Sequence, residues 1–228
     1  MMKTRFFSFA LIGLLVMAGI RVSAQTSKEA MQPQKEVNKL SKEQLNAKAS
    51  KDARKAAKQY QKEGWTVTPG ALPIEKQLDK AYLMQYEMDQ YGYPKYLMAE
   101  GMSIGESYDA ARFQAAEMAT LNLAGEIQRE ITELIDNSRA NKQLAAEEAA
   151  SLIESVGAGK TLISQSIGRT IRVVEMYRTL KNKNKEVMIR IAYNSEMAKE
   201  AAKNALRDEL EKKSEDLHKK LEKILSGK

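Results

Sequence analysis

One row of apolar side chains, spaced four residues apart, constrains the fold of this chain more than any other feature. The row starts with alanines and continues with larger residues: Ala111, Ala115, Ala119, Leu123, Ile127, Ile131 and Ile135. Because an α-helix turns once in about 3.6 residues, this spacing predicts a long helix with one apolar face. The alanines predict a close approach to a sheet in the first half of the helix. The larger side chains predict a wider gap in the second half.

The segments on either side of this helix have clear signals of their own. Residues 96–101 predict a strand, and Ser103 with Glu106 matches a capping box that would start the helix. Asp136-Asn137-Ser138 predicts an interruption. A second helical pattern then runs from Leu144 to Ile167.

Two extended segments and a final helix follow. Residues 186–193 alternate apolar and polar side chains, and residues 169–180 are rich in β-branched residues, so the pair predicts a hairpin. Its loop, residues 181–185, contains asparagines, which tolerate positive φ. The last helix is expected over residues 196–225. The predicted class is α+β, with a small, mostly antiparallel sheet in the order strand, long helix, helix, hairpin, long helix, preceded by a helical extension.

Charge is concentrated in one segment near the N-terminus. Residues 28–62 hold ten Lys/Arg against four Asp/Glu, a net charge of +6, with few large apolar residues. We therefore expect a solvated helix or a partly disordered leader, acting either as contact for an anionic partner or as a solubilising tether. The predicted organisation is a signal peptide (1–24), a basic helical or disordered leader (25–64), a helical and tyrosine-rich lead-in (65–94), an α+β core domain (95–205) and a charged C-terminal helix extension (206–228).

The first residues resemble a cleavable export signal. Lys3 and Arg5 precede an apolar run, residues 6–20, and Val22-Ser23-Ala24 offers small side chains at the cleavage positions. Cleavage is expected between Ala24 and Gln25; an uncleaved anchor is the alternative. No later stretch is apolar enough to span a bilayer. The expected location is the periplasm, the outer-membrane surface or the outside of the cell.

Composition argues against several kinds of chemistry. The chain has no cysteine, which excludes disulfides and thiolate metal sites, and His218 is the only histidine and is expected at the surface. Gly157 to Thr161 resembles a phosphate-binding loop, but Glu154 stands where that loop requires glycine, so a break between two helices is expected instead. We expect no cofactor, no nucleic-acid partner and no enzymatic activity.

Tyrosines gather in the lead-in. Five of the nine lie between residues 82 and 96. Tyrosine has an apolar ring and a polar tip, so Tyr82, Tyr86, Tyr91 and Tyr93 are candidates for a partner-binding surface or a ligand pocket. The alternative is a half-buried seam where a helix docks on a sheet.

A family resemblance starts at Ala99. Residues 99–127, AEGMSIGESYDAARFQAAEMATLNLAGEI, resemble the LPP-twenty family of small outer-membrane lipoproteins and the related N-terminal domain of the flagellar-assembly protein FlgT. With the hairpin at residues 169–193, the resemblance covers about residues 95–205. The Gly64-Trp65 and Pro94-Lys95-Tyr96 stretches also resemble exported envelope proteins of anaerobic Gram-negative bacteria. The resemblance implies an envelope location and a role in assembly or attachment. The lipid-bearing cysteine and the further flagellar domains are absent from this sequence.

The expected function is therefore that of a non-enzymatic, exported cell-envelope protein with an interaction or assembly role. A periplasmic ligand-binding module with a tyrosine-lined pocket is the alternative. Expected partners are envelope proteins or an anionic envelope surface. Leucines in the last helix (Leu210, Leu217 and Leu221) suggest either oligomerisation through a coiled coil or a solvated projecting helix.

Export can be checked at the protein level. If the signal is cleaved after Ala24, N-terminal sequencing of the chain recovered from the cell envelope should begin at Gln25. Recovery of the chain with Met1 intact would contradict cleavage.

Overall fold

A computed structural model describes residues 46–226 of the 228-residue chain. The predicted cleavage site between Ala24 and Gln25, and the first part of the leader, lie outside these residues. Residues 48–228 belong to one unit, and the architecture below is that of its described part. No helix within residues 46–226 combines the length and the apolar character needed to cross a membrane.

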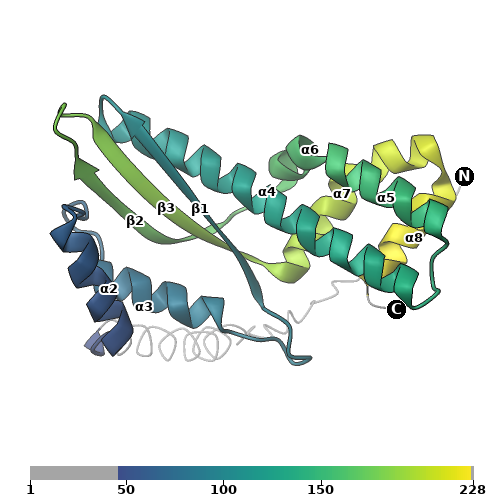
Figure 1. Ribbon diagram of the computed structural model, residues 1–228, viewed down its shortest axis with the longest axis horizontal. Coiled ribbons are helices and arrows are strands. Elements are labelled where there is room, and N and C mark those ends of the chain that lie inside the picture. Colours follow the sequence, from purple (N-terminus) through teal and green to yellow (C-terminus); the bar gives the residue numbers. More distant parts are fainter. Residues whose placement is uncertain (1–45, 227–228) are drawn as a thin grey trace, which may run out of the picture. The chain divides into compact units, whose positions relative to one another are not determined.

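The sheet has three antiparallel strands, β1 (Tyr96–Gly105), β2 (Ile171–Thr179) and β3 (Lys185–Asn194), in the order β1-β3-β2. The central strand β3 is buried on both faces. Val187 and Ile189 belong to one core cluster, whereas Met188 and Ala192 belong to the other. This alternation confirms the expected strand and places helices on both faces of the sheet (Figure 1). The α+β class is confirmed.

Helix α4 (Tyr108–Ala140) covers one face of the sheet and extends well beyond it (Figure 1). All seven residues of the four-residue row are buried, as the spacing predicts. The contact with β1 is close: a Cβ added to Gly101 would overlap the carbonyl oxygen of Ala115 and the amide of Ala119. A glycine on the strand and alanines on the helix thus bring two backbones together.

Both ends of α4 differ from expectation. Strand β1 continues to Gly105, so Ser103 lies in the strand, and the helix cap is Ser107, whose hydroxyl accepts from the amide of Ala110 at 3.2 Å. The expected interruption at residues 136–138 is also wrong. Helix α4 continues through this segment, with Ile135 and Ser138 buried, and the Ser138 hydroxyl donates to the carbonyl of Leu134 at 2.9 Å.

The other face of the sheet is covered by α2 (Lys51–Lys62) and α3 (Ile74–Gln85). Trp65, between these helices in sequence, is 4% exposed. Its ring lies edge-on to Tyr60, with centroids 6.4 Å apart, and beneath the guanidinium of Arg178 at 4.7 Å. The second core cluster is therefore built around an aromatic ring with a cation–π contact.

This packing corrects the expected leader for residues 49–62. Ala49, Ala53 and Ala57 are buried against α3 and the sheet, so α2 is part of the folded body. The sequence was misleading because alanine adds little to apparent hydrophobicity. Its small size nevertheless lets a helix approach its neighbours closely and bury that face.

Both edges of the sheet make further contacts. On the β2 edge, Thr66 and Tyr177 exchange two backbone hydrogen bonds of 2.8 Å. On the β1 side, the Asn122 side-chain amide donates to the carbonyl of Glu100 at 2.8 Å. Helix α4 and the segment before α3 thus both reach an edge strand.

A polar cluster fastens the start of α4 to β2. The Glu175 carboxylate accepts hydrogen bonds from Tyr108 and from Arg112, the latter at 2.9 Å, and pairs with Arg172. Burial and this hydrogen bond raise the pKa of Tyr108 to about 12. Burial alone would raise the pKa of Glu175. The hydrogen bond from Tyr108 and the charges of Arg172 and Arg112 outweigh burial, so the pKa of this carboxyl lies below its ordinary value. The Glu175 amide also donates to Gln77 of α3, at 2.6 Å.

The hairpin loop differs from expectation in one detail. Lys183, and neither of its neighbouring asparagines, has the positive φ, at 70°. Asn182 instead uses its side chain to accept from the amide of Asn184 at 3.1 Å. The turn is therefore closed by an asparagine side chain rather than by an asparagine backbone.

Beyond the sheet, the second half of α4 packs with four shorter helices: α5 (Ala146–Ala158), α6 (Lys160–Ser166), α7 (Ser195–Lys213) and α8 (Glu215–Leu225). The expected single helix over 196–225 is broken at Ser214, whose extended backbone (φ −171°) lets α8 fold back on α7. Leu206, Leu210 and Leu221 are fully buried in the core. The leucine row is thus used within the chain, and neither a projecting helix nor an exposed coiled-coil seam forms.

The close approach of α4 to β1 can be tested with one added side chain. Ala115→Leu should lower the free energy of unfolding by about 1–3 kcal/mol, because the larger residue overpacks the contact. Ala110→Leu, at an exposed position of the same helix, should change it by less than about 0.5 kcal/mol. Urea unfolding measures both; equal stability of the two variants would show that this face of α4 is not in close contact.

Candidate functional site

The loop that follows α3, residues 86–95, is held by its own hydrogen bonds. One carboxylate oxygen of Asp89 accepts from the amides of Tyr91, at 2.8 Å, and Tyr93, at 2.9 Å. Gly92, between them, has a φ of 84°, which glycine adopts at little cost. The loop thus presents Tyr91 and Tyr93 from a fixed backbone.

The base of this loop is also closed. The amide of Lys95 donates to the carbonyl of Glu87 at 2.9 Å, and the two side chains form an ion pair at 2.5 Å. Met88 and Pro94 form an antiparallel bridge between these contacts and the tip. We call residues 86–95 the tyrosine loop.

The four candidate tyrosines do not form one surface. Tyr82 packs partly buried against the second core cluster. Tyr86, Tyr91 and Tyr93 are 72%, 76% and 68% exposed, so the seam interpretation does not hold for these three. Only Tyr91 and Tyr93 line a hollow in the surface. Of the four tyrosines predicted from the sequence, Tyr91 and Tyr93 therefore belong to a candidate binding site.

This hollow, which we call the acidic groove, has a volume of about 1200 Å³. Its walls are the tyrosine loop, the second half of α4, the start of α7 and the end of α8. Leu97, Leu134, Ile224 and Leu225 supply its apolar lining. Its charged residues are five carboxylates and two cations: Asp89, Glu126, Glu130, Glu133, Glu196, Arg129 and Lys199.

Both cations of the groove are already paired. Arg129 forms an ion pair with Glu126, and Lys199 forms one with Glu196 at 2.9 Å. Glu133 makes no ion pair with any residue that the structure describes. The groove therefore carries uncompensated negative charge.

Glu130 is the most unusual of these carboxylates. One of its oxygens is buried and has no hydrogen-bond partner among the described residues. Burial raises the pKa of Glu130, and the nearby Glu196 and Glu133 raise it further, whereas Lys199 lowers it. A buried carboxylate without a donor is costly, and a cationic ligand would relieve that cost.

Sequence reasoning missed this acidic wall. Glu126, Glu130 and Glu133 recur at helical spacing on α4; the first two each precede a residue of the buried row, and Glu133 lies two positions from it. That spacing is a weak signal because solvated helices commonly carry such glutamates. Only the fold shows that the tyrosine loop and α7 close over them.

The segment resembling a phosphate-binding loop is a junction between two helices, as expected. Helix α5 ends at Ala158 and α6 begins at Lys160, with Gly159 between them. The Gly159 amide donates within the helix to Ser155 at 3.0 Å, and a side chain here would overlap Leu206 of α7. The glycine serves close packing.

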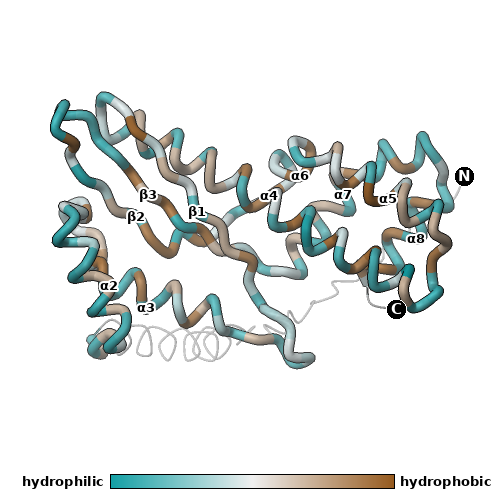
Figure 2. Tube along the Cα trace, viewed as in Figure 1, coloured by the Kyte–Doolittle hydropathy of each residue, from teal (hydrophilic) through white to brown (hydrophobic). Residues whose placement is uncertain are grey.

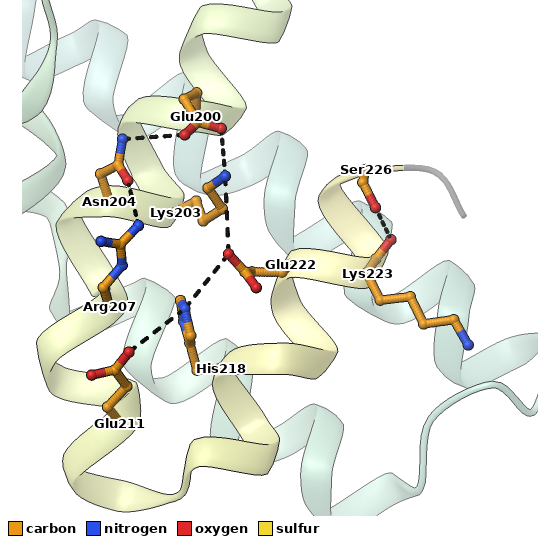
Figure 3. A network of polar contacts seen from close by, with 9 residues as sticks. All are labelled: Glu200, Lys203, Asn204, Arg207, Glu211, His218, Glu222, Lys223 and Ser226. Atoms are coloured by element: carbon orange, nitrogen blue, oxygen red, sulfur yellow. Dashed lines mark hydrogen bonds and ion pairs between the residues drawn. The ribbon is translucent and has the colours of Figure 1, made fainter.

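His218 is not at the surface, contrary to expectation. It is 6% exposed, enclosed by α7 and α8 (Figure 3). Its Nε2 lies 3.7 Å from Glu222 and 3.9 Å from Glu211, and Glu222 also faces Lys203 at 4.0 Å. The α7–α8 turn at Ser214 brings these groups together, so the cluster joins the two helices.

Within residues 46–226, no group of three or more His, Cys, Asp or Glu side chains is arranged to hold a metal ion.

Comparison of the chain with models of known protein families, with functionally characterised proteins and with solved structures finds no match.

The raised pKa of Glu130 predicts a pH-dependent stability. A carboxyl whose pKa is higher in the folded chain than in the unfolded chain destabilises the fold as pH rises above the ordinary value of 4.5. The wild type should therefore lose stability relative to Glu130→Gln between about pH 4 and about pH 7. Glu117→Gln, at an exposed position of α4, is the control and should parallel the wild type. Parallel pH profiles for all three chains in thermal unfolding would contradict the burial of Glu130.

Proposed function

We propose that this chain is a non-enzymatic, exported binding protein that holds a basic segment of another envelope protein in the acidic groove. The observation that carries the proposal is the combination, in one hollow, of two exposed tyrosines, uncompensated carboxylates and an apolar lining. A basic polypeptide could contact the tyrosine rings, the carboxylates and the apolar lining at the same time.

The size of the groove favours a chain over a metabolite. Sites for small molecules usually measure about 300–1,000 Å³. The acidic groove, at about 1200 Å³, exceeds that range and is walled by four separate segments. A polypeptide segment can contact all four at once, which a small molecule in one corner cannot.

Charge and aromatic character favour a basic segment. Carboxylates outnumber cations in the groove, and both cations already have partners. Lysine or arginine side chains of a partner would supply donors to Glu130 and Glu133, and could also lie over the rings of Tyr91 and Tyr93. Tyrosine is common in binding hot spots because its large surface is ordered at low entropic cost.

The envelope location is supported by the sequence. The basic, apolar and small-residue parts of residues 1–24 match an export signal, and residues 95–205 resemble envelope proteins with roles in assembly or attachment. The alternative, a ligand-binding module, would use the same groove for a small molecule.

Site-specific photocrosslinking in intact cells tests the proposal. A photoreactive phenylalanine analogue at position 91 or 93 should capture a protein, and mass spectrometry should map the adduct to a basic segment. Position 86 is the matched control, because Tyr86 is equally exposed but does not line the groove. Glu130→Gln combined with Glu133→Gln should reduce the adduct several-fold.

Other outcomes would contradict the proposal. Equal capture from positions 86 and 91 would show that the groove has no special role. An adduct to residues 25–45 of the same chain would show that the groove holds an intramolecular segment. A small molecule retained in native mass spectrometry, and lost in the Glu130/Glu133 variant, would favour the ligand-binding alternative.

A further inference from the structure

Helix α2 carries a straight row of lysines. Lys51, Lys55, Lys58 and Lys62 are spaced four, three and four residues apart. At about 100° per residue, these four side chains leave the helix within an arc of about 60°. All four are exposed, as is Lys48 just before the helix. We call the four helical residues the lysine row.

The lysine row belongs to a helix that is docked on the rest of the fold. The buried face of α2, formed by Ala53 and Ala57, lies on the opposite side of the helix. At the N-terminus of the helix, the amide of Ser50 donates to Asp79 of α3 at 3.0 Å, and Arg54 donates to the carbonyl of Ala49 at 2.8 Å. The lysines therefore project from a docked helix rather than from a tether.

The lysines of this row form no ion pair among the described residues. The acidic residues nearest in sequence, Asp52 and Glu63, project about 100–120° away from the row. Six lysines elsewhere in the fold each have a carboxylate within 4.0 Å, and the described lysines that lack one are scattered rather than aligned: the six are Lys95, Lys199, Lys203, Lys213, Lys219 and Lys220. Uncompensated positive charge is thus concentrated on one face of α2, a helix that Figure 2 colours as largely hydrophilic.

From this geometry we infer that α2 docks the protein onto the surface of an anionic phospholipid bilayer. The row extends for about 16 Å along the helix, and it contains four equal point charges. Lysine needs no fixed hydrogen-bond geometry, and mobile lipid headgroups can rearrange to meet such a row.

Two observations favour a bilayer over other polyanions. The exposed face of α2 has no aromatic side chain between the lysines, whereas proteins that bind single-stranded nucleic acids interleave aromatics and basic residues. The lysine row contains no arginine, the residue whose bidentate contact phosphate or carboxylate recognition favours, and Arg54, the only arginine of α2, already donates through Nη1 to a backbone carbonyl. The exposed face also has no large apolar residue to insert, so attachment rests on charge and is reversed by salt.

Vesicle co-sedimentation tests this inference. The chain from Gln25 onward should bind vesicles of phosphatidylcholine and phosphatidylglycerol, should be released at high salt, and should leave pure phosphatidylcholine vesicles unbound. Each lysine near an anionic surface contributes about fivefold to the affinity, so replacing all four with glutamine should weaken binding by at least about 100-fold. Glutamine keeps a helix propensity close to that of lysine.

A scattered variant of equal charge is the matched control. Lys160, Lys181, Lys212 and Lys223 are exposed and form no ion pair with described residues. Their replacement by glutamine removes the same charge from separate places and should weaken binding far less. Circular dichroism melting should show that both variants fold.

Three results would overturn the inference: equal loss of binding in the two variants, equal binding to neutral and anionic vesicles, or binding to poly-glutamate but not to vesicles. The last would assign the lysine row to an acidic protein. None of these results bears on the acidic groove, because the lysine row does not line it and the crosslinking experiment does not depend on lipid.

Discussion

The rest of the structure depends on the contact between the backbones of α4 and β1. Gly101 leaves room for the carbonyl of Ala115 and the amide of Ala119, so the helix lies directly on the strand. This contact fixes the first half of α4 over the sheet and therefore sets the direction in which its second half leaves it. Helices α5 to α8 pack on that second half, and the acidic groove lies where it passes the tyrosine loop.

Sequence patterns predicted the elements that bury large side chains at regular spacing. The four-residue row of α4 and the alternation of β3 are both confirmed, because each repeats its period over several turns or residue pairs. Predictions failed where small residues, or the conformation of a single residue, determine the local structure. Buried alanines dock α2, α4 continues through a polar segment in which Ser138 is buried, and the extended backbone of Ser214 reverses the last helix.

The acidic groove, too, could be predicted only in part from the sequence. The tyrosines were visible as a cluster, but the hydrogen bonds of Asp89 select which of them face a common hollow. Three of the five carboxylates come from α4, which follows in the sequence, and the remaining walls come from residues near positions 195 and 225. Because these parts meet only in the folded chain, a partner bound there would favour the folded state over the unfolded one.

The contacts at the two sheet edges have a consequence for aggregation. Two of the three strands are edge strands, and open edges invite pairing with other chains and aggregation. Thr66 occupies backbone groups of Tyr177 on β2, and Asn122 engages the carbonyl of Glu100 on β1. These engaged groups are not available to an added strand. A single asparagine and a short bridge thereby oppose edge-to-edge pairing of this small sheet with other chains.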